Sequence, residues 1–384
     1  MGKAIEVPVK PSVLQWALRE SGYPPSALAK RLHVPLSTVD AWERGEGHKP
    51  TLTQFRRLAQ VLKRTPATLL LPRPPASSAR DVKLRHAPGV DRDSLNHEER
   101  RFIREAGRVQ DTVAWIMKEL DEGPPDIPEL AVGSDIERTA SRVRTRLLSH
   151  LTRPVAEWDS SAEAFREWRA ALERLGILVF ILQLGKGSCR GFSLWNDRAP
   201  LIAVNSAPNY EARIFTLFHE YAHLLTRTSS ACLEGGRGKK FSAPTDPAER
   251  WCERLAAAIL LPWNEVRAFV PQGGNVRDLS IPKIIASRFK VSLRAATLRL
   301  IERGAADWSL YSEIPAYADD KRPGGGGKGR TRGEAKENQW GDRTVNLFVT
   351  ALDRDVVNRA DVLDYLDVTN ADLDRLQRTG AGSE

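Results

Sequence analysis

The stretch FTLFHEYAHLLT, residues 215–226, has the apolar composition of a buried helix but carries two histidines and a glutamate at its centre. Residues four apart lie on the same face of a helix, so His219 and His223 can bind one ion together. Glu220 lies beside that face, within reach of anything the ion holds. The segment therefore predicts a helix built around a small polar site.

His219, Glu220 and His223 form the pattern His-Glu-x-x-His. Neutral imidazoles at i and i+4 bind Zn²⁺ from one helical face, and a carboxylate at i+1 can take a proton from a water on the metal. Zinc also polarises the carbonyl of an amide, so water attacks it at neutral pH. The alternative is a helix with two core histidines, each of which would need its own buried partner. We therefore predict zinc held by the two histidines, with Glu220 as the catalytic base.

A catalytic zinc has three protein ligands and one open position. The other histidines all lie earlier in the chain, in the N-terminal helical segment or before the predicted strands: His33, His48, His86, His97 and His150. The third ligand is therefore expected to be a carboxylate or a thiolate. The next long helical segment, 247–262, offers Glu249 near its N-terminal end, and Cys252 and Glu253 are rivals on the same face.

The segments around this site alternate between apolar strands and periodic helices. Short Val/Ile/Phe-rich segments bounded by turn residues predict strands at 176–184, 189–197 and 199–205. Helical periodicity predicts helices at 98–120, 134–150, 160–175, 211–226 and 247–262, within 281–304, and as short helices within 341–378. The Gly/Ser-rich segment 228–245 predicts a loop, and the basic, Gly-rich segment 322–339 predicts a linker or a ligand-touching loop.

The composition excludes several classes of protein. With 41% hydrophobic and 28% charged residues the chain has the balance of a globular protein, and its apolar runs are far shorter than the roughly 20 residues that span a bilayer. No basic stretch followed by an apolar one opens the chain, so no secretory signal is expected. Three widely spaced cysteines, Cys189, Cys232 and Cys252, argue against a disulfide framework. We therefore expect a cytoplasmic protein without membrane contact.

Basic charge is concentrated in the first 75 residues, which hold 12 Lys and Arg against 5 Asp and Glu, a net of +7 out of +9 for the whole chain. Such a segment suits a polyanion. Its apolar periodicity predicts helices at 26–32, 37–44 and 52–63. A turn through Val34 and Pro35 separates the first two, and Ser37 with Asp40 is a predicted capping pair.

This arrangement resembles the XRE (Cro/C1-type) DNA-binding family through ALAKRL, STVDAWERG, the Pro-containing loop and RLAQVL. The resemblance implies that helix 37–44 enters the major groove of double-stranded DNA, with Trp42 packed inward. Base edges would face Ser37, Thr38 and Asp40, and phosphates would meet Arg44 and Lys49. Paired half-sites would favour a homodimer. The alternative is a small helical bundle used only for protein contacts.

Residues from about 175 to 300 resemble the ImmA/IrrE family of zinc metallopeptidases. The stretch PLIAVN with RIFTLFHEYAHLL is similar to that family's strand and His-Glu-x-x-His helix, ERWCERLAAAILLP to its second motif, and FKVSLRAATLRL to its third. The resemblance implies that the first glutamate of the second motif, here Glu249, is the third zinc ligand. The chain departs from the pattern at Cys252 and Glu253, where Ala and Asn are common, and at Phe218, where a small residue is frequent. None of these changes removes a ligand.

These patterns predict a mainly α protein with a small β-sheet, an α+β class. We expect an all-α helix-turn-helix domain at 1–75, a linker and connecting helix at 76–130, a zincin-like metallopeptidase domain at 131–315, and a Gly-rich loop with a helical C-terminal region at 316–384.

The residues alone predict a zinc-dependent hydrolase of an amide. The resemblance implies a gluzincin-like endopeptidase that cleaves a protein substrate, a transcriptional repressor or antitoxin, and so switches on genes for stress response or mobile-element transfer. The alternative is a DNA-binding regulator or antitoxin-like repressor whose zinc fold serves as a sensor or partner-binding module. Glu220 favours the enzyme, because a structural zinc site has no need of a base.

Overall fold

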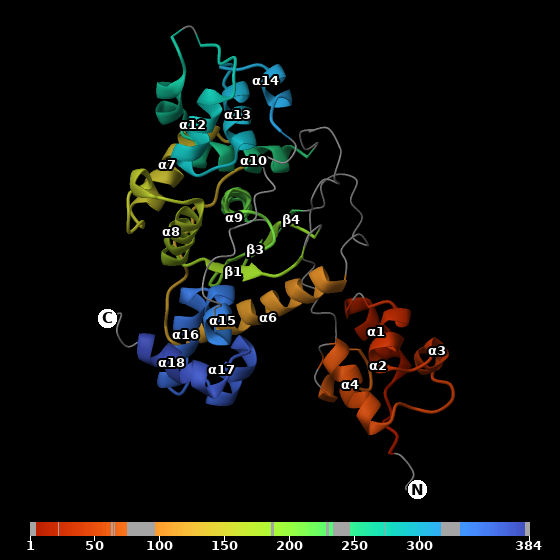
Figure 1. Cartoon of the computed structure of the whole chain (residues 1–384). Coiled ribbons are helices and arrows are strands. Elements are labelled where there is room, and N and C mark those ends of the chain that lie inside the picture. Colours follow the sequence, from red (N-terminus) through yellow and green to blue (C-terminus); the bar gives the residue numbers. More distant parts are fainter. Residues whose placement is uncertain are drawn as a thin grey trace. The chain divides into compact units, whose positions relative to one another are not determined.

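The computed structural model describes residues 5–21, 23–62, 64, 66–74, 97–185, 188–227, 230–232, 246–272, 274–315 and 331–380. The chain divides into two compact units, Met1–Val82 with Asp91–Glu105 and Lys83–Val90 with Ala106–Glu384 (Figure 1). Each unit has its own apolar core.

Short helices form the first unit: α1 (Pro11–Ser21), α2 (Pro25–Leu32), α3 (Leu36–Arg44), α4 (Leu52–Leu62) and α5 (Pro66–Leu69). Apolar side chains three or four residues apart on these helices meet in a core that includes Leu14, Leu28, Val39, Trp42, Phe55 and Leu58. His33 takes a positive φ of 55° at the end of α2, which turns the chain into the start of α3. The predicted helix-turn-helix is therefore present, with Trp42 packed inward.

The start of α3 differs from the prediction of a capping pair between Ser37 and Asp40. The helix begins at Leu36, its N-cap is Pro35 with φ −59° and ψ 148°, and no side chain caps it. The proline ring fixes φ at a value compatible with a helix start, so the chain enters the helix without a hydroxyl cap. Ser37 lies inside the first turn, and the predicted capping pair is wrong.

The second unit is built on a small sheet with the strand order β1-β3-β2-β4. β1 (Leu178–Leu182) runs parallel to β3 (Leu201–Asn205), and β2 (Gly191–Leu194) runs antiparallel to β3 and to β4 (Ser230–Cys232). β1, β2 and β3 are buried along their whole length, which matches their mainly apolar sequence, although Ser193 and Asn205 are polar. The three predicted strands are confirmed.

β4 corrects the prediction that 228–245 is a loop throughout. Its backbone pairs with the edge of β2, and such pairing depends on the partner strand rather than on a local apolar pattern. The rest of 228–245 lies outside the described residues.

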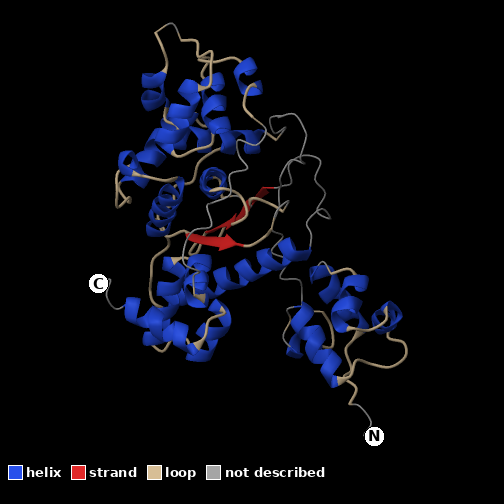
Figure 2. Ribbon diagram, in the orientation of Figure 1, coloured by secondary structure: helices blue, strands red, loops and turns tan. Residues whose placement is uncertain are grey.

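Helices surround the sheet (Figure 2). In chain order they are α6 (His97–Glu119, which belongs to this unit from Ala106), α7 (Ile136–Leu148), η2 (Val155–Glu157), α8 (Ser161–Arg174), α9 (Tyr210–Leu225), α10 (Pro247–Leu260), α11 (Trp263–Val266), η3 (Arg267–Phe269), α12 (Ser280–Phe289), α13 (Leu293–Glu302), α14 (Trp308–Ser312), α15 (Arg332–Trp340), α16 (Asp342–Asp353), α17 (Arg359–Leu366) and α18 (Asn370–Gly380). The fold is mainly α with a small sheet, as predicted.

Most residues of α9, the helix that carries the two histidines, are buried. It packs on β2 and β3 and lies between α8 and α10. The side chain of Asn209 accepts a hydrogen bond from the backbone N–H of Ala212 at 2.9 Å and caps the start of the helix. Further along, the Phe218 ring meets the Trp168 ring of α8 edge to face, with centroids 5.0 Å apart. The cap fixes where α9 begins, and the ring contact holds α9 against α8.

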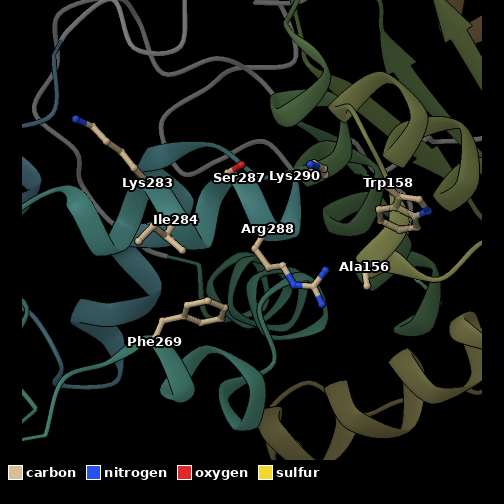
Figure 3. Close-up of a pocket in the computed structure, with 8 residues that line it drawn as sticks. All are labelled: Ala156, Trp158, Phe269, Lys283, Ile284, Ser287, Arg288 and Lys290. Carbon is tan, nitrogen blue, oxygen red and sulfur yellow. The ribbon is translucent and has the colours of Figure 1, made fainter.

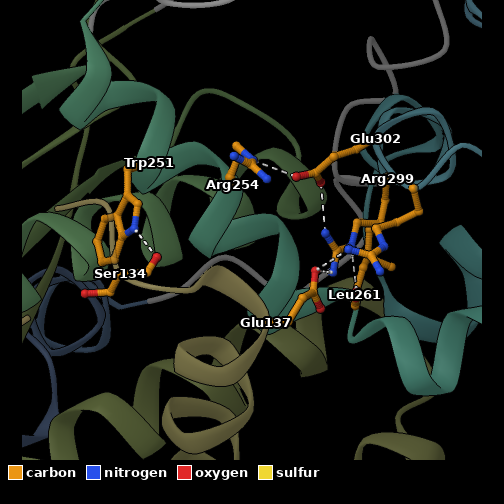
Figure 4. Close-up of polar contacts among 8 residues, drawn as sticks. Ser134, Glu137, Trp251, Arg254, Leu261, Arg299 and Glu302 are labelled. Carbon is orange, nitrogen blue, oxygen red and sulfur yellow. Dashed lines mark hydrogen bonds and ion pairs between the residues drawn. The ribbon is translucent and has the colours of Figure 1, made fainter. Parts of the chain in front are cut away.

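A buried guanidinium joins α13 to α7 and to the end of α10 (Figure 4). Arg299, whose side chain is fully buried, donates to the carbonyl of Leu261 at 3.0 Å, to Glu137 at 2.7 Å and to Glu302 at 2.8 Å. Arg144 of α7 donates to the carbonyl of Ile259 at 2.7 Å. Two cations therefore satisfy carbonyls at the C-terminal end of α10, where the helix dipole favours positive charge.

The C-terminal helices belong to the same unit and correct the prediction for 322–339. Residues 322–330 lie outside the described part of the chain, but α15 occupies 332–340. Thr331 and Glu334 form a capping box that starts this helix. At its other end Trp340 is buried edge to face on Phe180 of β1, with centroids 5.0 Å apart. Tertiary contact with the sheet therefore holds a helix in a segment whose glycines and charges suggested a linker.

Within the described residues, no helix is both long enough and apolar enough to cross a membrane.

Candidate metal centre

The two histidines of α9 lie where their spacing predicts. His219 and His223 are one turn apart on the same face, and both side chains are buried. Their Nε2 atoms are 3.2 Å apart. Two ring nitrogens therefore converge on one point inside the second unit.

Glu249 completes the cluster from the first turn of α10. Its Oε2 lies 3.3 Å from Nε2 of His219, and its Oε1 lies 3.3 Å from Nε2 of His223. The N-cap Asp246 accepts a hydrogen bond from the backbone N–H of Ala248 and fixes this end of the helix. Among the described residues, His219, His223 and Glu249 are the group of histidine, cysteine and acidic side chains placed closely enough to share a metal ion.

The donor set and its spacing fit zinc. Two imidazole nitrogens and one carboxylate are ligands that zinc accepts in catalytic sites. Bonds of about 2.0–2.1 Å in a tetrahedral arrangement separate the ligand atoms by roughly 3.3 Å. The observed separations of 3.2 Å and 3.3 Å match that spacing.

Charge in the cluster is balanced between acid and bases. Burial lowers the pKa of His219, but the hydrogen bond to Glu249 and the charges of Glu220, Glu249 and Glu253 outweigh burial and raise it. Burial raises the pKa of Glu249, but the two imidazoles outweigh that effect and hold the pKa well below its usual range. The site therefore stabilises the ionised carboxylate of Glu249 next to a positively charged imidazole of His219.

Neither rival third ligand lies in the cluster. Cys252 Sγ is 3.8 Å from Nδ1 of His223, the ring nitrogen opposite the one that faces Glu249. Burial and then the neighbouring carboxylates raise the pKa of the Cys252 thiol. Glu253 is half-buried one turn beyond Glu249, and burial raises its pKa while the charge of His219 opposes the rise. Of the three candidates on α10, the geometry brings Glu249 to the histidines.

Glu220 is fully buried beside the cluster, and its charge raises the pKa of His219. It lies close to β2, because a Cβ placed on Gly191 would come within 3.5 Å of Cγ of Glu220. The same Cβ would come within 2.6 Å of Cγ2 of Thr216 and 2.7 Å of the carbonyl of Ala203. Gly191 thus lets α9 approach the sheet closely. Sequence reasoning missed this residue, although a glycine inside a strand is a known signal of close approach.

Tyr221 lies in the apolar core of the second unit, and burial raises its pKa. Its ring is therefore part of the packing of this unit.

The residues expected to contact DNA lie on α3 and in the loop after it. Ser37, Arg44 and Lys49 are exposed, and Thr38 and Asp40 are half-buried. Arg44 forms an exposed ion pair with Glu46 at 3.1 Å. Their contacts with DNA stay a prediction.

A groove elsewhere in the second unit carries no such chemistry (Figure 3). It has a volume of about 520 Å³ and is lined by Ala156, Trp158, Phe269, Lys283, Ile284, Ser287, Arg288 and Lys290. None of these side chains is an acid, a histidine or a cysteine, so the groove offers neither a metal ligand nor a carboxylate base.

Fold and site together define a helix-turn-helix protein that also carries a metallopeptidase-like unit. Residues 172–300 match the family model of the IrrE N-terminal-like domain, peptidase M78, and residues 14–69 match a helix-turn-helix family model. The chain therefore joins a helix-turn-helix DNA-binding domain to an IrrE N-terminal-like domain of the peptidase M78 family, as the two resemblances predicted. A comparison with curated proteins found no match.

Proposed function

We propose that this chain is a zinc-dependent endopeptidase fused to a DNA-binding domain and that it cleaves a transcriptional repressor or antitoxin. The observation that carries the proposal is the buried cluster of His219, His223 and Glu249 with the carboxylate of Glu220 beside it. The proposed domains are those predicted from the sequence: the DNA-binding domain at 1–75, the linker and connecting helix at 76–130, the metallopeptidase domain at 131–315 and the C-terminal region at 316–384.

Each residue of the site has a separate role in this proposal. His219 and His223 would hold a zinc ion through Nε2, and Glu249 would hold it through a carboxylate oxygen. A zinc ion held there supplies a Lewis acid that polarises an amide carbonyl and lowers the pKa of water. Glu220 takes a proton from the attacking water and returns it to the leaving amine. Because Glu220 is buried, its charge acts at short range with little screening.

The helix-turn-helix domain supports a regulatory substrate. A peptidase carried on a DNA-binding domain is concentrated near operators, where repressors also bind. Switching on stress-response or mobile-element genes is the outcome we propose for such a cut. DNA binding supports the proposal of a cytoplasmic location, and recognition of paired half-sites would make the protein a homodimer.

A second candidate function is a DNA-binding regulator whose zinc fold senses a signal or binds a partner. The helix-turn-helix unit favours it, because that unit has a core of its own and an exposed Arg44 and Lys49. Glu220 separates the two candidates, since only the peptidase needs a carboxylate base next to the metal.

The test compares protein N-termini in cells that produce the wild type or Glu220→Gln, which leaves His219, His223 and Glu249 in place. The peptidase predicts a new N-terminus in one DNA-binding protein, present with the wild type and absent with the variant. Identical N-termini in the two samples would contradict the peptidase. If the wild type and Glu220→Gln also occupied the same DNA sites, the result would support the second candidate function, a DNA-binding regulator.

A further inference from the structure

The imidazole of His223 is held by α10 at both of its ring nitrogens. Nε2 lies 3.3 Å from Oε1 of Glu249, and Nδ1 lies 3.8 Å from Sγ of Cys252, one turn further along the same helix. Both Cys252 and His223 are buried, with exposed fractions of 0% and 1%. One helix therefore supplies the metal-side partner and the far-side partner of the same ring.

The other histidine ligand is held differently. Nδ1 of His219 makes no hydrogen bond to any described residue. The thiol therefore gives His223 a far-side contact that His219 lacks within the described part of the chain.

The hydrogen-bond chemistry of a metal ligand assigns the direction of this contact. If Nε2 of a neutral imidazole binds a metal, Nδ1 carries the ring proton and donates it. Metal-binding histidines commonly donate this proton to a carboxylate, carbonyl or water, which fixes the tautomer and orientation of the ring. A thiol sulfur is a weak acceptor, but 3.8 Å is within the range of hydrogen bonds to sulfur.

We infer that Cys252 is a positioning residue, which accepts the Nδ1 proton of His223 and holds its ring in the tautomer that binds zinc through Nε2. The inference rests on the proposed function, since it concerns the same metal site. It goes beyond the ligand set by assigning a role to a residue that the sequence offers only as a rival ligand.

Two other roles for Cys252 make different predictions. As a ligand, it would turn its sulfur toward the point between the two Nε2 atoms, whereas the sulfur lies against Nδ1. As a packing residue alone, it would influence stability but not metal affinity.

The experiment measures zinc affinity of the full-length wild type, Cys252→Ala and Cys252→Ser by competition with a chromophoric chelator. Cys189→Ala is the matched control, because Cys189 is also buried in the second unit. Removing a partner of this kind typically lowers metal affinity about 10- to 100-fold. We expect that loss for Cys252→Ala, affinity close to wild type for Cys252→Ser because a hydroxyl also accepts the proton, and no change for Cys189→Ala.

A wild-type affinity in Cys252→Ala would overturn the inference while leaving the proposed function intact. A wild type that binds no zinc would overturn both. Substitution of Co²⁺ into the wild type gives a further check, since a thiolate-to-cobalt charge-transfer band would make Cys252 a ligand and overturn its positioning role.

The tautomer itself can be read without any substitution. Long-range ¹H–¹⁵N NMR of the zinc-loaded wild type distinguishes protonated from metal-bound ring nitrogens. We expect Nδ1 of His223 to carry the proton. A His223 ring bound to zinc through Nδ1 would overturn the inference even if the alanine variant failed to fold.

Discussion

At the scale of single residues, the site depends on a glycine that has no chemistry of its own. Gly191 of β2 lies where a Cβ would come within 2.6 Å of Thr216 and 2.7 Å of the carbonyl of Ala203. The carbonyl belongs to the sheet and cannot move without breaking pairing. The space left by the missing side chain is what lets α9 lie against the sheet with Glu220 beside the histidines.

Gly191→Ala should therefore destabilise the protein. Overpacking of this kind costs about 1–3 kcal/mol, and the urea midpoint should fall accordingly. Gly107→Ala is the matched control, since its Cβ would meet only Leu194 at 3.9 Å, an ordinary contact. Equal midpoints for Gly191→Ala and the wild type would show that α9 does not need this close approach.

Glu173 makes stability depend on pH. Burial raises its pKa to about 7, and the charge of Asp342 adds to the rise while the ion pair with Arg169 opposes it. The folded state therefore holds this proton more tightly than the unfolded state, in which the pKa of the carboxyl group is near its ordinary value of 4.5. The stabilisation is complete below the unfolded pKa and is lost as pH rises through about 7.

Glu173→Gln should remove that dependence, because the amide cannot ionise. Between pH 5 and 8 the wild type should lose up to about 3 kcal/mol of stability relative to the variant. Thermal midpoints of both proteins across this range measure the difference. Arg169 keeps its hydrogen bonds to the carbonyls of Val179 and Asn338 in both proteins. Parallel curves of thermal midpoint against pH would contradict a raised pKa of Glu173.

At the scale of elements, α10 is held by cations at its C-terminal end while Glu249 at its other end faces the histidines. Arg299 joins the carbonyl of Leu261 to Glu137 and Glu302. Lysine cannot make these three contacts at once, because it lacks the planar fork of the guanidinium.

Arg299→Lys should lower the free energy of unfolding by about 3 kcal/mol, the order of a broken buried ion pair. Arg303→Lys is a suitable comparison, since Arg303 reaches the same Glu137 at 3.4 Å but from a partly exposed position. Its effect should stay within about 1 kcal/mol. Urea unfolding measures the stability of both variants. Equal losses of stability would show that α10 does not depend on the buried guanidinium of Arg299.

How much of the fold the sequence predicts depends on whether the signal is local. The helices with a clear apolar period and the strands β1, β2 and β3 are local signals, and the structure confirms them. β4 and α15 depend on partners far along the chain, so the Gly-rich and polar segments that contain them predict loops instead. The predicted cap on α3 fails for a local reason, because Pro35 already starts the helix.

The candidate site follows the same division. His219 and His223 are four residues apart on one helix, so their convergence is readable from spacing alone. Spacing left Glu249, Cys252 and Glu253 as alternatives, because the rotation of α10 against α9 decides which of them faces the histidines. A glycine inside a predicted strand signals that something approaches closely, but the sequence does not say that α9 is what approaches Gly191. The contact between Cys252 and Nδ1 of His223 likewise arises from the packing of α10 against α9.

At the scale of the whole molecule, the two units divide the charge. The first 75 residues carry a net +7 of the total +9, and the exposed Arg44 and Lys49 are in this part. If these cations meet phosphates, their effect on affinity should not depend on DNA sequence.

Arg44→Ala and Lys49→Ala should each weaken binding of the full-length protein to duplexes of unrelated sequence by a similar factor. Each should also reduce the slope of log Kd against log salt by about one. Fluorescence anisotropy across a salt series measures both quantities. Lys118→Ala, an exposed lysine of the second unit, should leave the slope unchanged. A wild-type slope in both N-terminal variants would place the DNA contacts elsewhere.

The central claim is that α9 and α10 together form a zinc site, and metal content tests it most directly. Mass spectrometry would measure zinc in the full-length wild type, Glu249→Gln, Glu220→Gln and Glu253→Gln after metal-replete purification. We predict about one zinc per chain in the wild type, the same in Glu220→Gln and Glu253→Gln, and loss in Glu249→Gln. A wild type without zinc, or a Glu249→Gln variant that keeps it fully, would contradict the account.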